Sequence, residues 1–219
     1  MNNYKYEEQS GRSMIEMLGV LAIIGVLSVG GIAGYSKAMN KFKTNKVADN
    51  VSMLVANIKT LYAQQKNYDE LDNAAAVSMG VVPDELISDR DAGTLLNAFN
   101  GNVDIHVSGS TKDDGSDKKA FVISFGSLSR EACITLATND WGSGYSSGLI
   151  AIRASATSEE DDDKALDETV IGDDGDDTAN ASIATPGGET LAVPMNVVKA
   201  AAACGCTSGN TCSIQWKYY

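Results

Sequence analysis

The sequence is poor in aromatic residues, histidine and proline, and each shortage narrows what the chain can be. Aromatic residues make up 6% of its 219 residues, so a folded core has to be modest and built mainly from Ala, Val, Ile and Leu. A single histidine leaves few ligands for a zinc site. Only three prolines occur, and none precedes Pro83, so no residue forces a helix to break between Met14 and about Lys66.

Basic residues are also scarce, and the acidic excess is concentrated in one segment. The chain has 17 Lys and Arg against 29 Asp and Glu, a net charge of −12. Nucleic-acid binding depends on clustered Lys and Arg, so nucleic acid is excluded as a partner. Eleven of the acidic residues and one lysine lie between Glu159 and Asp177. We expect residues 156–180 to form a solvated loop. Asp173–Thr178 lacks the final Glu of an EF-hand loop, and a looser calcium site there is less favoured than a solvated loop because of the segment's composition.

A long helix is predicted near the N-terminus. Residues from Met14 to Tyr35 are apolar or small, Glu16 is the only charged one among them, and the run is long enough to cross a bilayer as a helix. Helical periodicity then continues, because apolar residues recur at spacings of three and four along one face. That stripe consists of Val47, Val51, Leu54, Ile58 and Leu61. We therefore predict one helix over residues 12–66, apolar in its first half and amphipathic in its second.

Short helices and strands are predicted for the remainder, residues 67–219, which should form a globular head. Helices are expected at residues 74–80, after a Ser129 cap, and from Pro194 onward. Alternating or apolar runs predict strands at residues 102–107, 119–125, 149–153 and 213–218. The predicted class is α+β, with the long helix packed on an antiparallel sheet.

Four cysteines, Cys133, Cys204, Cys206 and Cys212, favour disulfides over a metal site. Their number is even, the apolar helix indicates export, and Cys-Gly-Cys does not have the usual spacing of zinc ligands. His106 has no second histidine to work with, and the serines lie in glycine-rich turns instead of a nucleophile motif. The sequence therefore predicts no catalytic residue, no metal and no cofactor.

The most specific motif is Gly11-Arg12-Ser13-Met14-Ile15-Glu16, directly before the apolar run. It resembles the processing site of type IV prepilins, whose class III signal peptide ends in glycine. The resemblance implies that prepilin peptidase removes residues 1–11 and methylates the new amino terminus at Arg12. Family members usually begin with an apolar residue at that position. Glu16 becomes the fifth mature residue, and the resemblance implies that it pairs with the amino terminus of a neighbouring subunit during assembly. An uncompensated carboxylate in an apolar helix is costly, which agrees with a functional role.

The resemblance extends into the head, which looks like that of type IVb pilins. The segments that carry it are MGVVPDEL, NAFNGNVDIHV, the Ser-Arg-Glu-Ala-Cys133 helix and the terminal strand after a late cysteine. The fold implied is an α/β roll with a disulfide from Cys133 to the C-terminal segment. Cys204, Cys206 and Cys212 all compete as its partner.

A turn argument selects one cysteine pairing. A three-residue turn at residues 208–210 would place Cys206 opposite Cys212 across a hairpin, in the geometry that a disulfide needs. Cys204 would then pair with Cys133. The main rival exchanges Cys204 and Cys206 between the two bonds.

By this resemblance the chain is expected to be a structural subunit, and the major one, of a type IV pilus-like filament. Two alternatives stay open: a pseudopilin of a type II secretion system, and a monomeric binding module tethered to a membrane. The expected partners are further copies of the chain, prepilin peptidase, the inner-membrane assembly machinery and, before assembly, membrane lipid. The expected location is the bacterial inner membrane and then an extracellular filament.

Overall fold

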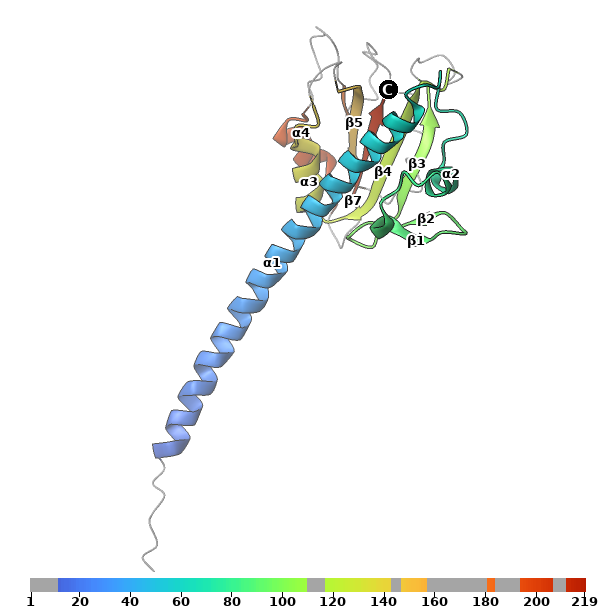
Figure 1. The fold of residues 1–219 in the computed structure, drawn as a ribbon. Coiled ribbons are helices and arrows are strands. Elements are labelled where there is room, and N and C mark those ends of the chain that lie inside the picture. The colour runs from blue at the N-terminus through green and yellow to red at the C-terminus, as the bar shows by residue number, and fades with distance from the viewer. Residues whose placement is uncertain (1–11, 110–116, 143–146, 157–180, 184–193, 207–211) are drawn as a thin grey trace, which may run out of the picture. The chain divides into compact units, whose positions relative to one another are not determined.

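The structure, a computed structural model, describes residues 12–109, 117–142, 147–156, 181–183, 194–206 and 212–219 (Figure 1). The predicted leader, most of the acidic segment and the turn between Cys206 and Cys212 lie outside these residues. By its internal contacts the chain divides into two units, Met1–Lys41 and Phe42–Tyr219. The second unit, called the head below, therefore includes the C-terminal part of the long helix, which the predicted boundary at residue 67 had separated from it.

Helix α1 (Arg12–Tyr62) is the long helix that the sequence predicts. It ends at Tyr62, four residues before the predicted Lys66. The chain turns there, with the Gln65 amide donating to the Tyr62 carbonyl at 2.8 Å, and the ring of Tyr68 then lies 5.1 Å from the ring of Tyr62. The Tyr68 amide also donates to the Lys118 carbonyl at 2.7 Å. Contacts distant in sequence therefore end the helix, and periodicity alone does not reveal them.

A five-stranded antiparallel sheet forms the main layer of the head. Its order is β3 (Val103–Ser108), β4 (Ala120–Leu128), β7 (Cys212–Tyr218), β5 (Leu149–Ser155) and β6 (Ala181–Ile183). The four predicted strands are present, whereas β6 was not predicted. The C-terminal strand β7 lies in the centre, where it pairs with both β4 and β5 (Figure 1). All seven residues of β7 are buried.

The main core lies between one face of this sheet and the C-terminal half of α1, which crosses that face in Figure 1. Four residues of the predicted α1 stripe are fully buried, Val47, Val51, Leu54 and Ile58. The fifth, Leu61, is 46% exposed. Strand β7 contributes Trp216, whose ring packs edge-on against Phe125 and Trp141. The core is thus aliphatic on the helix side, as predicted, with an aromatic cluster on the sheet side.

Polar side chains attach the edges of α1 to the rest of the head. The Lys46 ammonium lies 2.9 Å from the Glu85 carboxylate, and the Asn57 side chain donates to the Val81 carbonyl at 2.8 Å. Lys59 donates to the Ser147 carbonyl at 2.6 Å and lies 4.9 Å above the ring of Tyr218. These contacts fix the rotation of α1 about its axis, which the apolar stripe alone leaves less defined.

Two short helices pack beside the sheet, each with a side-chain cap. Ser129 accepts from the Ala132 amide and begins α3 (Arg130–Thr138), as predicted. Helix α4 (Val197–Ala203) is capped by Asn196, so Pro194 lies before the helix and not in its first turn. The prediction of a helix start at Pro194 was wrong because an amide side chain can accept from the Val198 amide, and proline has no side chain that can do so.

Helix α2 (Asn73–Ser78), the 3-10 helix η1 (Asp84–Leu86) and a small hairpin of β1 (Ile87–Asp89) and β2 (Thr94–Leu95) complete the head. The hairpin was not predicted. Its turn contains Gly93 with φ of +65°, where an added Cβ would lie 2.9 Å from the Ala74 Cα. Only glycine allows this approach, which brings the hairpin against α2.

Replacing Leu54 by Ala should lower the head's free energy of unfolding by about 2–5 kcal/mol, because the change leaves a cavity at a fully buried site. The matched control is Leu61→Ala in the same helix, where the side chain is 46% exposed and the loss should be much smaller. Urea unfolding in detergent, followed by tryptophan fluorescence, measures both, since Trp141 and Trp216 both lie in the head. Equal losses in the two variants would contradict the burial of this stripe.

The head should also lose stability in alkali, because burial raises the pKa of the Tyr218 phenol. A folded-state pKa above the unfolded value of about 10 leaves stability unaffected well below pH 10. Stability then falls as the pH rises from there toward the folded pKa. Tyr218→Phe keeps the ring beneath Lys59 but cannot ionise, so its unfolding midpoint in urea should drop less between pH 8 and 11. Tyr35→Phe, at an exposed position, should behave like the original chain.

Candidate functional site

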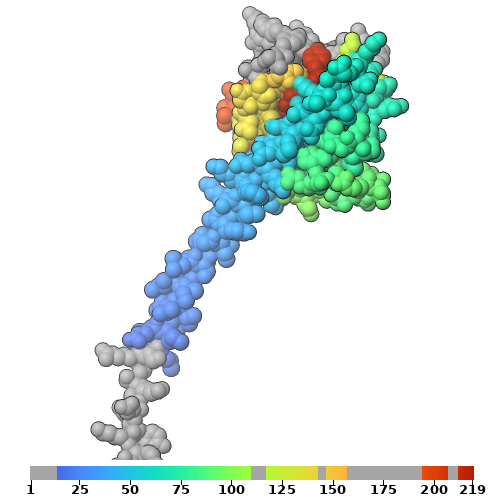
Figure 2. Space-filling model, in the orientation of Figure 1, coloured from blue at the N-terminus to red at the C-terminus, as the bar shows by residue number. Residues whose placement is uncertain are grey.

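The first half of α1 presents an apolar surface on all its sides. We call residues 14–35 the apolar stem; nearly all of its large side chains are more than half exposed (Figure 2). These are Met14, Ile15, Met17, Leu18, Val20, Leu21, Ile23, Ile24, Val26, Leu27, Val29, Ile32 and Tyr35. By length and composition this helix could cross a membrane. Monomeric soluble proteins rarely expose so large a contiguous apolar surface, so the stem is a surface for lipid or for other protein chains.

Glu16 lies in the second turn of α1, and its side chain is exposed. It is the only charged residue of the apolar stem. Among the described residues, the salt bridges all lie in the head, and none of them involves Glu16. A carboxylate in this position is available to a cation outside the described chain.

The residues of the predicted processing site are only partly described. Arg12 is the first residue of α1, and the helix continues from it without interruption into the apolar stem. Gly11 lies outside the described residues. The cleavage itself stays a prediction.

Two disulfides join the C-terminal part of the head. Cys133 of α3 is bonded to Cys204 at the end of α4, with the Cα atoms 5.9 Å apart and a sequence separation of 71. Cys206 is bonded to Cys212, the first residue of β7. This is the pairing that the turn argument predicted. The long-range bond holds α4 to α3, and α3 packs against β7. The loop that the bond closes contains β5 and β6.

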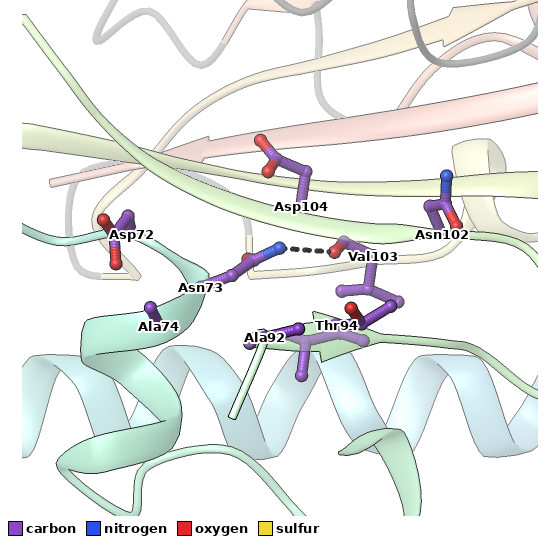
Figure 3. Close-up of a pocket in the computed structure, with 10 residues that line it drawn as sticks. Asp72, Asn73, Ala74, Ala92, Thr94, Asn102, Val103 and Asp104 are labelled. Carbon is purple, nitrogen blue, oxygen red and sulfur yellow. Dashed lines mark hydrogen bonds between the residues drawn. The ribbon is translucent and has the colours of Figure 1, made fainter. Parts of the chain in front are cut away.

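A polar pocket of about 480 Å³ lies where α2 meets the edge strand β3 (Figure 3). The Asn73 side chain crosses it, donating to the Val103 carbonyl at 3.0 Å and accepting from the Ile105 amide at 2.8 Å. The amide thus pairs with the exposed edge of the sheet as another strand would. This arrangement protects an edge strand from pairing with a second chain. The hydrogen bonds between Asn73 and the edge of the sheet give the pocket a structural explanation. The sequence did not single out Asn73, because no local sequence pattern indicates this contact.

The single histidine of the chain, His106, lies on β3, on the face of the strand that is turned away from the main core. His106 Nδ1 lies 2.7 Å from an oxygen of Asp104, and the imidazole is mostly buried. A His–Asp pair can support general-base catalysis only beside a nucleophile or a substrate site. The strand register places valine at position 122 opposite His106. Within the described residues, no group of three or more His, Cys, Asp or Glu could hold a metal ion.

Comparison with known proteins identifies the family. The family model described as PilS N terminal matches residues 41–185, about two thirds of the chain. The chain belongs to the PilS family of type IV pilins. Its long helix on an antiparallel sheet is the pilin fold that the sequence predicted.

Named relatives and a solved structure agree with this assignment. The pilin is 26% identical over 140 residues to the major structural subunit of the bundle-forming pilus of Escherichia coli O127:H6, covering 64% of this chain and 68% of that one. It is 27% identical over 139 residues to the toxin coregulated pilin of Vibrio cholerae, covering 60% and 58% respectively. A crystal structure of a type IVb pilin from Salmonella typhi superposes with a TM-score of 0.50 at 14% identity, over 78% of this chain and 95% of that one. This last likeness shows the fold.

The two disulfides of the pilin should differ in their contribution to stability. Replacing both Cys133 and Cys204 by Ala removes a cross-link across 71 residues, and the chain-entropy model gives a loss of about 4 kcal/mol. Replacing Cys206 and Cys212 removes a link across six residues, for which the same model gives about 2 kcal/mol.

Urea unfolding of the two double variants, compared under oxidising conditions, measures the difference. A smaller loss from the Cys133 and Cys204 pair than from the Cys206 and Cys212 pair would show that loop closure does not set these contributions.

Proposed function

We propose that this pilin is the polymerising structural subunit, and the major one, of a type IV pilus-like extracellular filament. The observation that carries the proposal is the exposed apolar stem, joined to a folded head that is closed by two disulfides. The named relatives support it, since two of them are a major pilus subunit and a toxin coregulated pilin. The role is structural and involves no catalysis.

Packing of apolar stems against one another would drive assembly. An apolar helix exposed on all sides is stable in lipid or among other helices, and unstable in water. Gly25, Gly30, Gly31 and Gly34 have open space around their Cα atoms, so neighbouring helices could approach them closely. Leaving the membrane for a bundle of copies then exchanges lipid contacts for helix contacts, and the stem stays out of water throughout.

Glu16 would set the register between neighbouring stems. Its carboxylate sits among apolar residues, where an unpaired charge is costly. The positive amino terminus that cleavage after Gly11 would produce is a suitable partner on the next subunit. Within one chain this amino terminus and Glu16 are four residues apart in the sequence, so the terminus of one copy can meet the Glu16 of a staggered copy. Pairing between copies staggered along the filament satisfies both charges at once.

Processing and location follow from the same proposal. Prepilin peptidase would remove residues 1–11 and methylate Arg12, and the inner-membrane assembly machinery would then extract the subunit from the lipid. The head would fold outside the cytoplasm, where its disulfides form. The mature protein would end in a filament on the cell surface.

One experiment separates this proposal from a secretion pseudopilin and from a monomeric tethered module. Filaments sheared from the surface of expressing cells are collected by sedimentation and analysed by mass spectrometry. A pilus subunit forms the bulk of the sheared fraction. A pseudopilin or a tethered monomer stays with the cells, which would overturn the proposal.

The mature pilin should begin at Arg12. Gly11 precedes a Ser-Met-Ile-Glu entry into the apolar stem, so cleavage after it removes the whole polar leader. The intact mass of the protein in sheared filaments, with fragmentation of the N-terminal peptide, tests the start and its methylation. Filaments that retain Met1, or that begin beyond Tyr35, would contradict the prediction.

Replacing Glu16 by Gln should greatly reduce filament yield and leave the head folded, because the partner of this charge lies on another subunit. Asp49→Asn is the matched control: it removes one exposed carboxylate from the same helix, within the head and outside the apolar stem. Filament yield and the urea midpoint of the head are measured for both. A normal yield from the Glu16 variant would exclude its role in register.

A further inference from the structure

Lysine residues follow the apolar stem directly along α1. Residues 17–48 contain no acidic residue and four basic ones, which are Lys37, Lys41, Lys43 and Lys46. All four belong to the same continuous helix as the stem. The surface of this helix therefore changes, at the end of the stem, from one without charge to one whose charges are all positive.

The last two of these lysines have partners within the head. The Lys46 ammonium lies 2.9 Å from the Glu85 carboxylate. Lys43 Nζ lies 5.5 Å from the centre of the Phe99 ring, in the arrangement of a cation–π contact. Contacts inside the head thus account for both of these side chains.

The first two lysines, Lys37 and Lys41, are exposed, and we call them the basic pair. Among the described residues, neither takes part in a salt bridge. The two positions are four residues apart, so their side chains lie on the same face of the helix. One face of α1 therefore presents two neighbouring ammonium groups just beyond the stem.

The length of the stem places the basic pair at the surface of a membrane. The stem has 22 residues. At about 1.5 Å per residue it spans about 33 Å, close to the hydrocarbon thickness of about 30 Å. It ends at Tyr35, and tyrosine is enriched where a helix leaves the hydrocarbon. Lys37 follows two residues later, and the long side chain of Lys41 can reach back toward the lipid headgroups. Lipid phosphates are therefore within reach of both ammonium groups.

Membrane topology does not explain the lysines beside the stem. Lysine and arginine close to a membrane span favour the cytoplasmic side. The two disulfides favour the opposite side for the head, because disulfides form in oxidising compartments. Positive charge between the stem and an exported head therefore works against export, and its presence needs another explanation.

We propose that Lys37 and Lys41 bind the phosphate groups of anionic phospholipid where the stem leaves the membrane. Charge complementarity selects this partner, because two exposed ammonium groups on one helix face suit a negatively charged lipid surface. A zwitterionic headgroup presents the same phosphate together with a cation, so it should bind more weakly. The inference rests on the proposed function in one respect, the storage of the stem in a membrane before assembly, and it adds the lipid class and the residues that bind it.

Binding at the basic pair has a consequence for assembly. Headgroups that contact Lys37 and Lys41 have to be released when the stem leaves the membrane. A ligand that binds only one of two states shifts the equilibrium toward that state. Anionic lipid therefore favours the stored subunit over the assembled one.

Native mass spectrometry of the whole chain in a nonionic detergent tests the proposal. Phosphatidylglycerol or phosphatidylcholine is added stepwise, and the bound lipid is counted. We expect phosphatidylglycerol to bind more tightly. Lys37→Gln with Lys41→Gln should weaken its binding about thirtyfold, because each lysine at an anionic lipid surface contributes about fivefold. Lys37→Arg with Lys41→Arg keeps both charges and should keep the binding.

Lys66→Gln with Lys119→Gln is the matched control, because it removes two exposed lysines of the head and the same amount of charge. This control should bind phosphatidylglycerol like the original chain. Equal affinity of the original chain for the two lipids, or equal losses in the two glutamine variants, would overturn the proposal. Undiminished binding after Lys37→Gln with Lys41→Gln would also overturn it, and would assign the basic pair to another partner, such as a carboxylate of a second copy.

The filaments in the sheared fraction test the proposed function separately. If the pilin is absent from that fraction, the filament proposal fails, and the lipid titration still decides whether the basic pair binds anionic lipid. If the titration shows no preference for phosphatidylglycerol while filaments are present, only the lipid proposal fails.

Discussion

Four aliphatic side chains of α1 are fully buried in the main core. Trp216 of the central strand β7 belongs to the same core. This contact joins the first helix of the chain to its last strand. The sheet depends on this contact, because β7 pairs with β4 on one side and with β5 on the other. Strands β4 and β5 do not pair with each other. The long-range disulfide acts on the same region, because α3 packs against β7 and α4 is bonded to α3.

The two halves of the continuous helix α1 differ in how their apolar side chains are arranged. In the head, apolar residues occupy a single face, and polar contacts from Lys46, Asn57 and Lys59 fix the helix at its edges. In the apolar stem, large apolar side chains point in all directions and are exposed. The head can therefore reach its fold with its own contacts, whereas the stem requires lipid or other stems.

Much of the fold could be predicted because its signals are local. The period of the α1 stripe, the Ser129 cap and the alternation in four strands all depend on residues close in sequence, and the prepilin motif lies within six residues. The helix end at Tyr62 could not be predicted, since it depends on Tyr68 and Lys118 meeting in space. Asn73 is similar, because an asparagine that pairs with a strand 30 residues later leaves no local pattern. The small hairpin of β1 and β2 is too short for alternation to reveal it.

The central place of β7 has a consequence for the order in which the pilin can fold. Strands β4 and β5 have no partner in common until β7 is available, so two of the four strand pairings in this sheet wait for β7. Contacts between the beginning and the end of a chain close long loops, and proteins dominated by such contacts fold slowly. The two halves of the sheet therefore spend the interval before β7 arrives with unpaired edges. Correct pairing therefore requires that the last strand inserts faster than the unfinished chain associates with other unfinished chains.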